Sequence, residues 1–95
     1  MYGTIAKLKV KKGMEETAKT GMDRDVPSEG HVGHFLYQMD DNPNEFYLVV
    51  VFDSKESYRA NVESPESNEG FEKMMTYLES EPEWHDGEIV LKKGF

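Results

Sequence analysis

Alternating hydrophobic and polar residues predict strands over residues 2–10 and 31–40, because successive side chains of a strand point to opposite faces. Residues 46–52 (FYLVVVF) do not alternate, since nearly every side chain is apolar or aromatic. A strand with one face in water should alternate, so we expect both faces of this strand to be covered. A fourth strand is expected over about residues 84–92.

Apolar residues spaced three or four apart predict helices between these strands. A weak helix is expected over roughly residues 13–24, because a glycine and two threonines lower its propensity. Ser54 can cap a second helix, and Ser64 followed by Pro65 marks the start of a further one. That last helix carries an apolar stripe at Phe71, Met74, Met75 and Leu78.

The predicted order β-α-β-β-α-β corresponds to an α+β, ferredoxin-like fold with a four-stranded antiparallel sheet. We expect residues 1–95 to form a single domain. The helices cover one face of such a sheet, and a chain of this size leaves little to cover the other. Two sheets are therefore expected to meet face to face in a homodimer.

Composition excludes several classes of function. The chain has no cysteine, which rules out disulfides, thiolate metal sites and thiol nucleophiles. Its formal charge of -8 argues against nucleic-acid binding, which needs a cationic surface. No apolar run approaches a membrane span, and the first residues lack the pattern of a signal peptide. We expect a cytoplasmic protein that does not bind membranes.

The three histidines are the first candidates for chemistry. His31 and His34 are three residues apart on a strand, so they are expected to point to opposite faces. Neither belongs to a pair with metal-ligand spacing, and we expect no metal site. His34 shares a predicted face with Leu36, where a packed, hydrogen-bonded role competes with a catalytic one. His85 lies between a tryptophan and an aspartate at the start of the last strand.

Aromatic residues are the second candidate group, with five tyrosines, five phenylalanines and one tryptophan. They can pack in the core and at an interface, or line a cavity for a flat apolar ligand. No phosphate-binding loop, nucleophile elbow or hydrolase triad accompanies them. The members considered for a cavity are Phe35, Tyr37, Phe46, Tyr47, Phe52, Tyr58, Phe71 and Tyr77.

Three segments resemble the antibiotic biosynthesis monooxygenase family. They are residues 51–66 (VFDSKESYRANVESPE), residues 5–13 (IAKLKVKKG) and residues 30–34 (GHVGH). The resemblance implies a dimeric α/β barrel. Characterised members include cofactor-independent enzymes that oxidise polycyclic phenols to quinones. Other members degrade haem, or oxidise or isomerise small quinones and aldehydes.

The chain departs from this family's pattern at positions that matter for chemistry. The family often has Trp where this chain has Phe52, and His where it has Asn61. The Asn, Trp and His on which the haem-degrading branch relies would fall near Ala6, Asn61 and Phe71, and none is retained. Haem degradation is therefore not expected, and no cofactor is predicted.

The resemblance implies a monooxygenase that oxidises a small aromatic or quinol substrate with O₂ and without a prosthetic group. The alternatives are a non-enzymatic, small-ligand-binding or stress-associated barrel, and a purely structural assembly module. We expect the site on the helix side of the sheet, near Phe52. The predicted catalytic residues are His34, Asn61 and Tyr58. The predicted substrate-binding residues are Tyr37, Phe52, Phe71, Met74 and His85.

Overall fold

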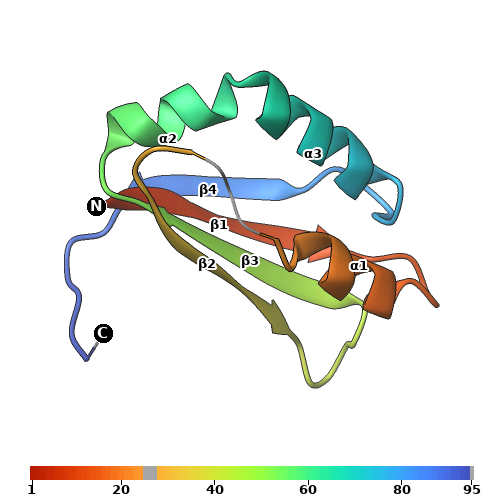
Figure 1. Ribbon diagram of the computed structural model, residues 1–95. Coiled ribbons are helices and arrows are strands. Elements are labelled where there is room, and N and C mark those ends of the chain that lie inside the picture. Colours follow the sequence, from red (N-terminus) through yellow and green to blue (C-terminus); the bar gives the residue numbers. More distant parts are fainter. Residues whose placement is uncertain (25–27, 95) are drawn as a thin grey trace.

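A computed structural model describes residues 1–24 and 28–94. It has a four-stranded antiparallel sheet with helices on one face (Figure 1). The strands are β1 (Tyr2–Lys9), β2 (His31–Gln38), β3 (Glu45–Phe52) and β4 (Glu83–Glu88). The helices are α1 (Glu15–Met22), α2 (Lys55–Val62) and α3 (Pro65–Met75). The order β-α-β-β-α-α-β confirms the ferredoxin-like fold and divides its second helical segment into two helices.

The predicted caps explain this division. The Ser54 hydroxyl accepts a hydrogen bond from the Ser57 backbone N–H, and the Ser57 hydroxyl accepts one from the Ser54 N–H. The Ser64 hydroxyl caps α3 by accepting a hydrogen bond from the Ser67 backbone N–H, with Pro65 at the first turn. Each cap satisfies N–H groups that a helix start leaves unpaired, so α2 and α3 begin where the sequence predicted.

The core lies between the sheet and the helices. The strand order is β2-β3-β1-β4, which places β1 and β3 in the centre. Side chains on the helix side of these two strands are buried and pack against both α1 and α3. The core residues are Ala6, Leu8, Val10, Ala18, Met22, Phe46, Met74, Tyr77 and Leu78.

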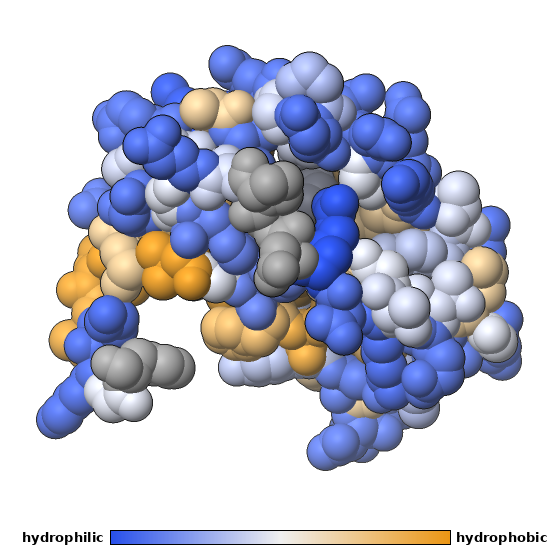
Figure 2. Space-filling view, viewed as in Figure 1, coloured by the Kyte–Doolittle hydropathy of each residue, from blue (hydrophilic) through white to orange (hydrophobic). Residues whose placement is uncertain are grey.

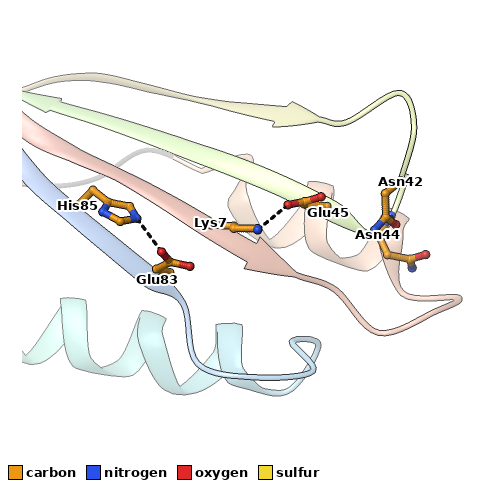
Figure 3. A network of polar contacts seen from close by, with 6 residues as sticks. All are labelled: Lys7, Asn42, Asn44, Glu45, Glu83 and His85. Atoms are coloured by element: carbon orange, nitrogen blue, oxygen red, sulfur yellow. Dashed lines mark hydrogen bonds and ion pairs between the residues drawn. The ribbon is translucent and has the colours of Figure 1, made fainter.

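The opposite face of the sheet carries no helix. Phe35 and Tyr37 stack there with 42% and 53% of their surfaces exposed. Figure 3 shows two polar pairs that the strand registers place on this face, Lys7–Glu45 and His85–Glu83, each at 3.1 Å. Within the described chain, β3 is thus closely packed on one face only.

A β-bulge changes the expected orientation of one histidine. Strand β2 pairs His31 with Phe52 and Gly33 with Val51, so Val32 is an extra residue. His31 and His34 therefore lie on the same face, and Nε2 of His31 is 3.1 Å from Nδ1 of His34. The prediction that they point to opposite faces is wrong, because a bulge shifts the period-two pattern by one residue.

The last strand is shorter than predicted, and residues 89–92 do not belong to it. The final sheet contact is the Ile89 N–H bonding to the Met1 carbonyl, where the ladder with β1 ends. Val90 and Leu91 are 90% and 82% exposed. Figure 1 shows this segment leaving the body of the molecule, and Figure 2 shows apolar surface at the point of departure.

Among the described residues, no helix is long and apolar enough to span a bilayer.

Candidate functional site

A cavity of about 640 Å³ lies between the sheet and the α2–α3 pair. The sheet forms its floor, with side chains of β1, β3 and β4 that point toward the helices. Helices α2 and α3 form its roof. Its volume falls within the range of about 300–1,000 Å³ that is common for small-molecule sites.

Much of the cavity wall is apolar. Phe52 is fully buried, and its ring packs edge-to-face on Tyr58 with centroids 5.7 Å apart. Phe71 and Met74 project from α3, and Trp84 from β4. These side chains form a surface suited to a flat apolar ligand.

One end of the cavity is built around a tyrosine and a carboxylate. The Tyr58 hydroxyl donates a hydrogen bond of 2.9 Å to Oδ1 of Asp86. Burial and this bond to an acidic side chain raise the pKa of Tyr58 to about 12, while the nearby Thr4 hydroxyl acts in the opposite direction. Tyr58 is therefore protonated at neutral pH and cannot serve there as a base.

Two further polar side chains line the cavity, those of Thr4 and Asn61. Oγ1 of Thr4 is buried and forms no regular hydrogen bond with a described residue, although it interacts with the Tyr58 hydroxyl and lowers the pKa of that phenol. The side-chain amide of the half-buried Asn61 forms no hydrogen bond with a described residue, although its backbone carbonyl accepts from Ser64. A buried polar atom that lacks a good hydrogen bond is costly, so Thr4 is suited to bind a polar atom of a ligand, and the Asn61 amide is free to bind another.

Five of the predicted site residues come together in this cavity. They are Phe52, Tyr58, Asn61, Phe71 and Met74.

The other three lie elsewhere. His34 lines a separate surface pocket beside α1, and its Nε2 is 3.1 Å from the Met22 carbonyl oxygen. Tyr37 and His85 lie on the open face of the sheet, away from the cavity. His85 forms a pair with Glu83 there, as Figure 3 shows.

Sequence reasoning missed Thr4, Trp84 and Asp86, which the structure places in the cavity. Strict alternation in β4 puts Trp84 and Asp86 on one face and His85 on the other. The alternation of β4 therefore carried the signal that Trp84 and Asp86, and not His85, face the helices.

Sequence reasoning also missed Arg24, the cationic side chain among the described residues that line the cavity. It follows α1 and forms no hydrogen bond or ion pair with a described residue. A Cβ at Gly70 of α3 would collide with Nη2 of Arg24, so this glycine makes room for the guanidinium. Nothing in the local sequence signals this contact, since the two residues belong to different elements.

No group of three or more His, Asp or Glu side chains within residues 1–24 and 28–94 could hold a metal ion.

A family model matches residues 1–73, that of the antibiotic biosynthesis monooxygenases. No curated protein matches the chain.

Solved structures show the same fold. A protein from Bordetella bronchiseptica, described as an antibiotic biosynthesis monooxygenase, has a TM-score of 0.82 at 21% identity, covering 95% of this chain and 97% of its own. A protein from Nitrosomonas europaea with the same description has a TM-score of 0.80 at 17% identity, covering 96% and 100%. A variant of SnoaB, a cofactor-independent oxygenase from Streptomyces nogalater, has a TM-score of 0.83 at 14% identity, covering 96% and 94%.

Proposed function

The chain belongs to the antibiotic biosynthesis monooxygenase family, and from this premise we propose that it is a cofactor-independent monooxygenase acting on a small aromatic or quinol substrate. The cavity under α2 and α3 carries this proposal. Aromatic and thioether side chains line it, together with the polar side chains of Thr4 and Asn61. Such a site holds a ring system and fixes the position of its oxygen atoms.

The reaction needs no external reductant. Loss of a proton from a phenolic hydroxyl gives an electron-rich anion that reacts directly with O₂. One oxygen atom enters the ring system, and the other leaves as water with two hydrogen atoms of the substrate. All electrons come from the substrate, which is converted to a quinone.

Different residues of the cavity would hold the substrate ring and bind its oxygen atoms. Phe52, Phe71 and Met74 hold the ring and keep water from the oxygen-reactive carbon. Tyr58 stays protonated, and its Oη can accept a hydrogen bond from a substrate hydroxyl. Asn61 can donate to a quinone oxygen as charge develops on it. We propose no substrate contact for His34, which lies outside this cavity.

We further propose that the protein acts as a homodimer in which two open sheet faces pack together. This face exposes Phe35 and Tyr37, and Val90 and Leu91 extend beyond the last strand into solvent. A second copy of the chain would bury these apolar side chains and pack against the open face of β3. Large exposed apolar surfaces are typical of interaction sites.

Oxygen consumption tests the proposed activity. Purified protein is incubated with a panel of small quinols and polycyclic phenols in ¹⁸O₂, with and without a chelator. We expect substrate-dependent O₂ uptake above the uncatalysed rate, one ¹⁸O atom in the product, and no effect of the chelator. Uptake equal to the protein-free rate across the panel would refute the activity.

The alternative is a small-ligand-binding protein without turnover. Asn61, where the family often has a histidine, favours it, because an amide is neither acid nor base near neutral pH. Binding alone would raise the melting temperature with ligand concentration while leaving the ligand chemically unchanged. Product analysis of the same samples separates the two functions.

A further inference from the structure

Arg24 occupies an unusual position for a surface cation. It lines the cavity, yet it forms no ion pair with a described carboxylate, including Glu29 and Glu66 of the same cavity. Its guanidinium lies against Gly70 of α3, in space that a side chain at this position would enter. A guanidinium offers five N–H donors, and none of these is hydrogen-bonded to a described residue.

The Tyr58–Asp86 pair belongs to the same cavity lining as Arg24. Asp86 holds the Tyr58 hydroxyl, and the same surroundings that keep this phenol neutral would also keep a bound substrate phenol neutral. A substrate anion is therefore disfavoured beside Tyr58, and Arg24 is the cationic side chain of the described lining that can favour one. The two sites can orient a substrate by charge.

The acidic side chains that line the cavity in the described chain are Glu29, Glu66 and Asp86, and Asp86 is engaged with the Tyr58 hydroxyl. None of the histidines in the described chain lines the cavity, and Tyr58 is already protonated. Arg24 is the group of this lining that favours a bound anion, since an opposite charge within a few ångströms stabilises the ionised form of an acid.

We propose, building on the function proposed above, that Arg24 is the anion-binding group of the cavity and that the substrate binds there as a phenolate, its ring against Phe71 and Met74. The O–H bond breaks, the proton passes to water beside the exposed Arg24, and the electron pair stays on the substrate oxygen. No protein base is required. Thr4 and Asn61 remain available for the neutral oxygen atoms of the substrate.

The test uses 4-nitrophenol, a phenol whose anion is coloured and whose neutral form is not. Its absorbance is titrated with pH, free and in the presence of saturating protein. In the wild-type protein we expect the pKa of the bound probe to lie about one unit below that of the free probe. The shift should be modest because water also reaches the guanidinium, and it should decrease with added salt.

Two variants and one matched control test whether Arg24 causes the change in the pKa of the bound probe. Arg24→Gln should abolish the downward shift. Gly70→Ala should reduce it by displacing the guanidinium, without loss of thermal stability, since alanine favours a helix more than glycine does. Arg59→Gln removes the same charge from α2 outside the cavity and should behave like the wild type.

A bound probe with an unchanged or raised pKa in the wild type would overturn the proposal. So would an equal downward shift in Arg24→Gln, or a failure of the probe to bind at all. These outcomes are independent of O₂ uptake: a lowered pKa without turnover supports the role of Arg24 and refutes only the oxygenase activity.

Discussion

The hydroxyl of Tyr58 on α2 donates a hydrogen bond of 2.9 Å to the carboxylate of Asp86 on β4. Strand β4 forms one edge of the sheet, so this bond ties the helical layer to an edge strand. The two residues are far apart in sequence and come from elements that are otherwise separated by the cavity. The bond therefore helps to fix how far the roof of the cavity stands from its floor.

The Tyr58 phenol should make stability depend on alkaline pH. Its pKa is about 12 in the folded protein and 10.0 as a reference, so the unfolded chain loses this proton first. Stability from this group is complete below about pH 10 and declines as the pH rises toward about 12. Urea unfolding at about pH 9 and about pH 11 should show a smaller decline in Tyr58→Phe than in the wild type.

Tyr37→Phe is the control for this measurement, because Tyr37 is exposed on the open sheet face. Tyr37→Phe should lose as much stability with rising pH as the wild type does. The buried Tyr77 also has a raised pKa, so some alkaline loss should persist in every variant. An identical decline in Tyr58→Phe and wild type would contradict the assignment.

Gly30 should not tolerate a side chain. Its φ is 89°, and a Cβ would lie 2.6 Å from both Oδ1 of Asp53 and Oγ of Ser57. Gly30→Ala is expected to lower the free energy of unfolding by about 2 kcal/mol, through backbone strain and disturbance of the α2 cap. Chemical denaturation measures the loss.

The matched substitution is Gly33→Ala, three residues further along the chain in β2. A Cβ there meets no atom within 4 Å, and φ is not positive. Its effect should stay within about 0.5 kcal/mol. Equal losses of stability in Gly30→Ala and Gly33→Ala would show that the positive φ and the contacts with the α2 cap do not require a glycine at position 30.

His34 should matter for stability rather than for ligand binding. Its Nε2 is within hydrogen-bond distance of the Met22 carbonyl, and its Nδ1 contacts His31. His34→Ala should cost about 1 kcal/mol of folding stability, because a half-buried carbonyl loses its partner. The affinity for an aromatic ligand, measured by calorimetry, should change less than about twofold, a small free-energy difference.

His85→Ala provides the comparison, since His85 and Glu83 form an exposed pair of the kind that contributes little to stability. A loss of ligand affinity in His34→Ala at unchanged stability would return His34 to the list of substrate contacts.

The open sheet face should carry the dimer contact. Sedimentation at micromolar concentration is expected to give twice the chain mass of 10.9 kDa. Phe35→Lys should shift the protein to the single-chain mass, because it places a charge within the proposed apolar contact. Val62→Lys alters an apolar residue of α2 that is 51% exposed, and should leave the mass unchanged. A single-chain mass for the wild type would refute the dimer.

Most of the fold could be predicted because the relevant signals are local. Alternation identified β1 and β2, a continuous apolar run identified β3, and Ser54, Ser64 and Pro65 marked the helix starts where the structure has them. The end of the last strand was wrong because the apolar pattern of residues 89–91 indicates strand propensity but not whether a pairing partner exists.

The candidate site was only partly predictable, since contacts between distant elements leave no periodic signal. Phe52, Tyr58 and Asn61 were found through the family resemblance and lie in the cavity. Arg24 and Asp86 were missed, because their significance depends on which elements fold over one another. The position of His31 was wrong because a bulge cannot be read from an alternating pattern.

The extra residue at Val32 has a consequence for comparing this chain with its relatives. The alternation of inward and outward side chains along β2 shifts by one residue at Val32. A relative without the bulge would align with this chain only through a one-residue gap at this point. An ungapped alignment would equate inward side chains with outward ones before Val32, and would misplace His31 and the loop that precedes it.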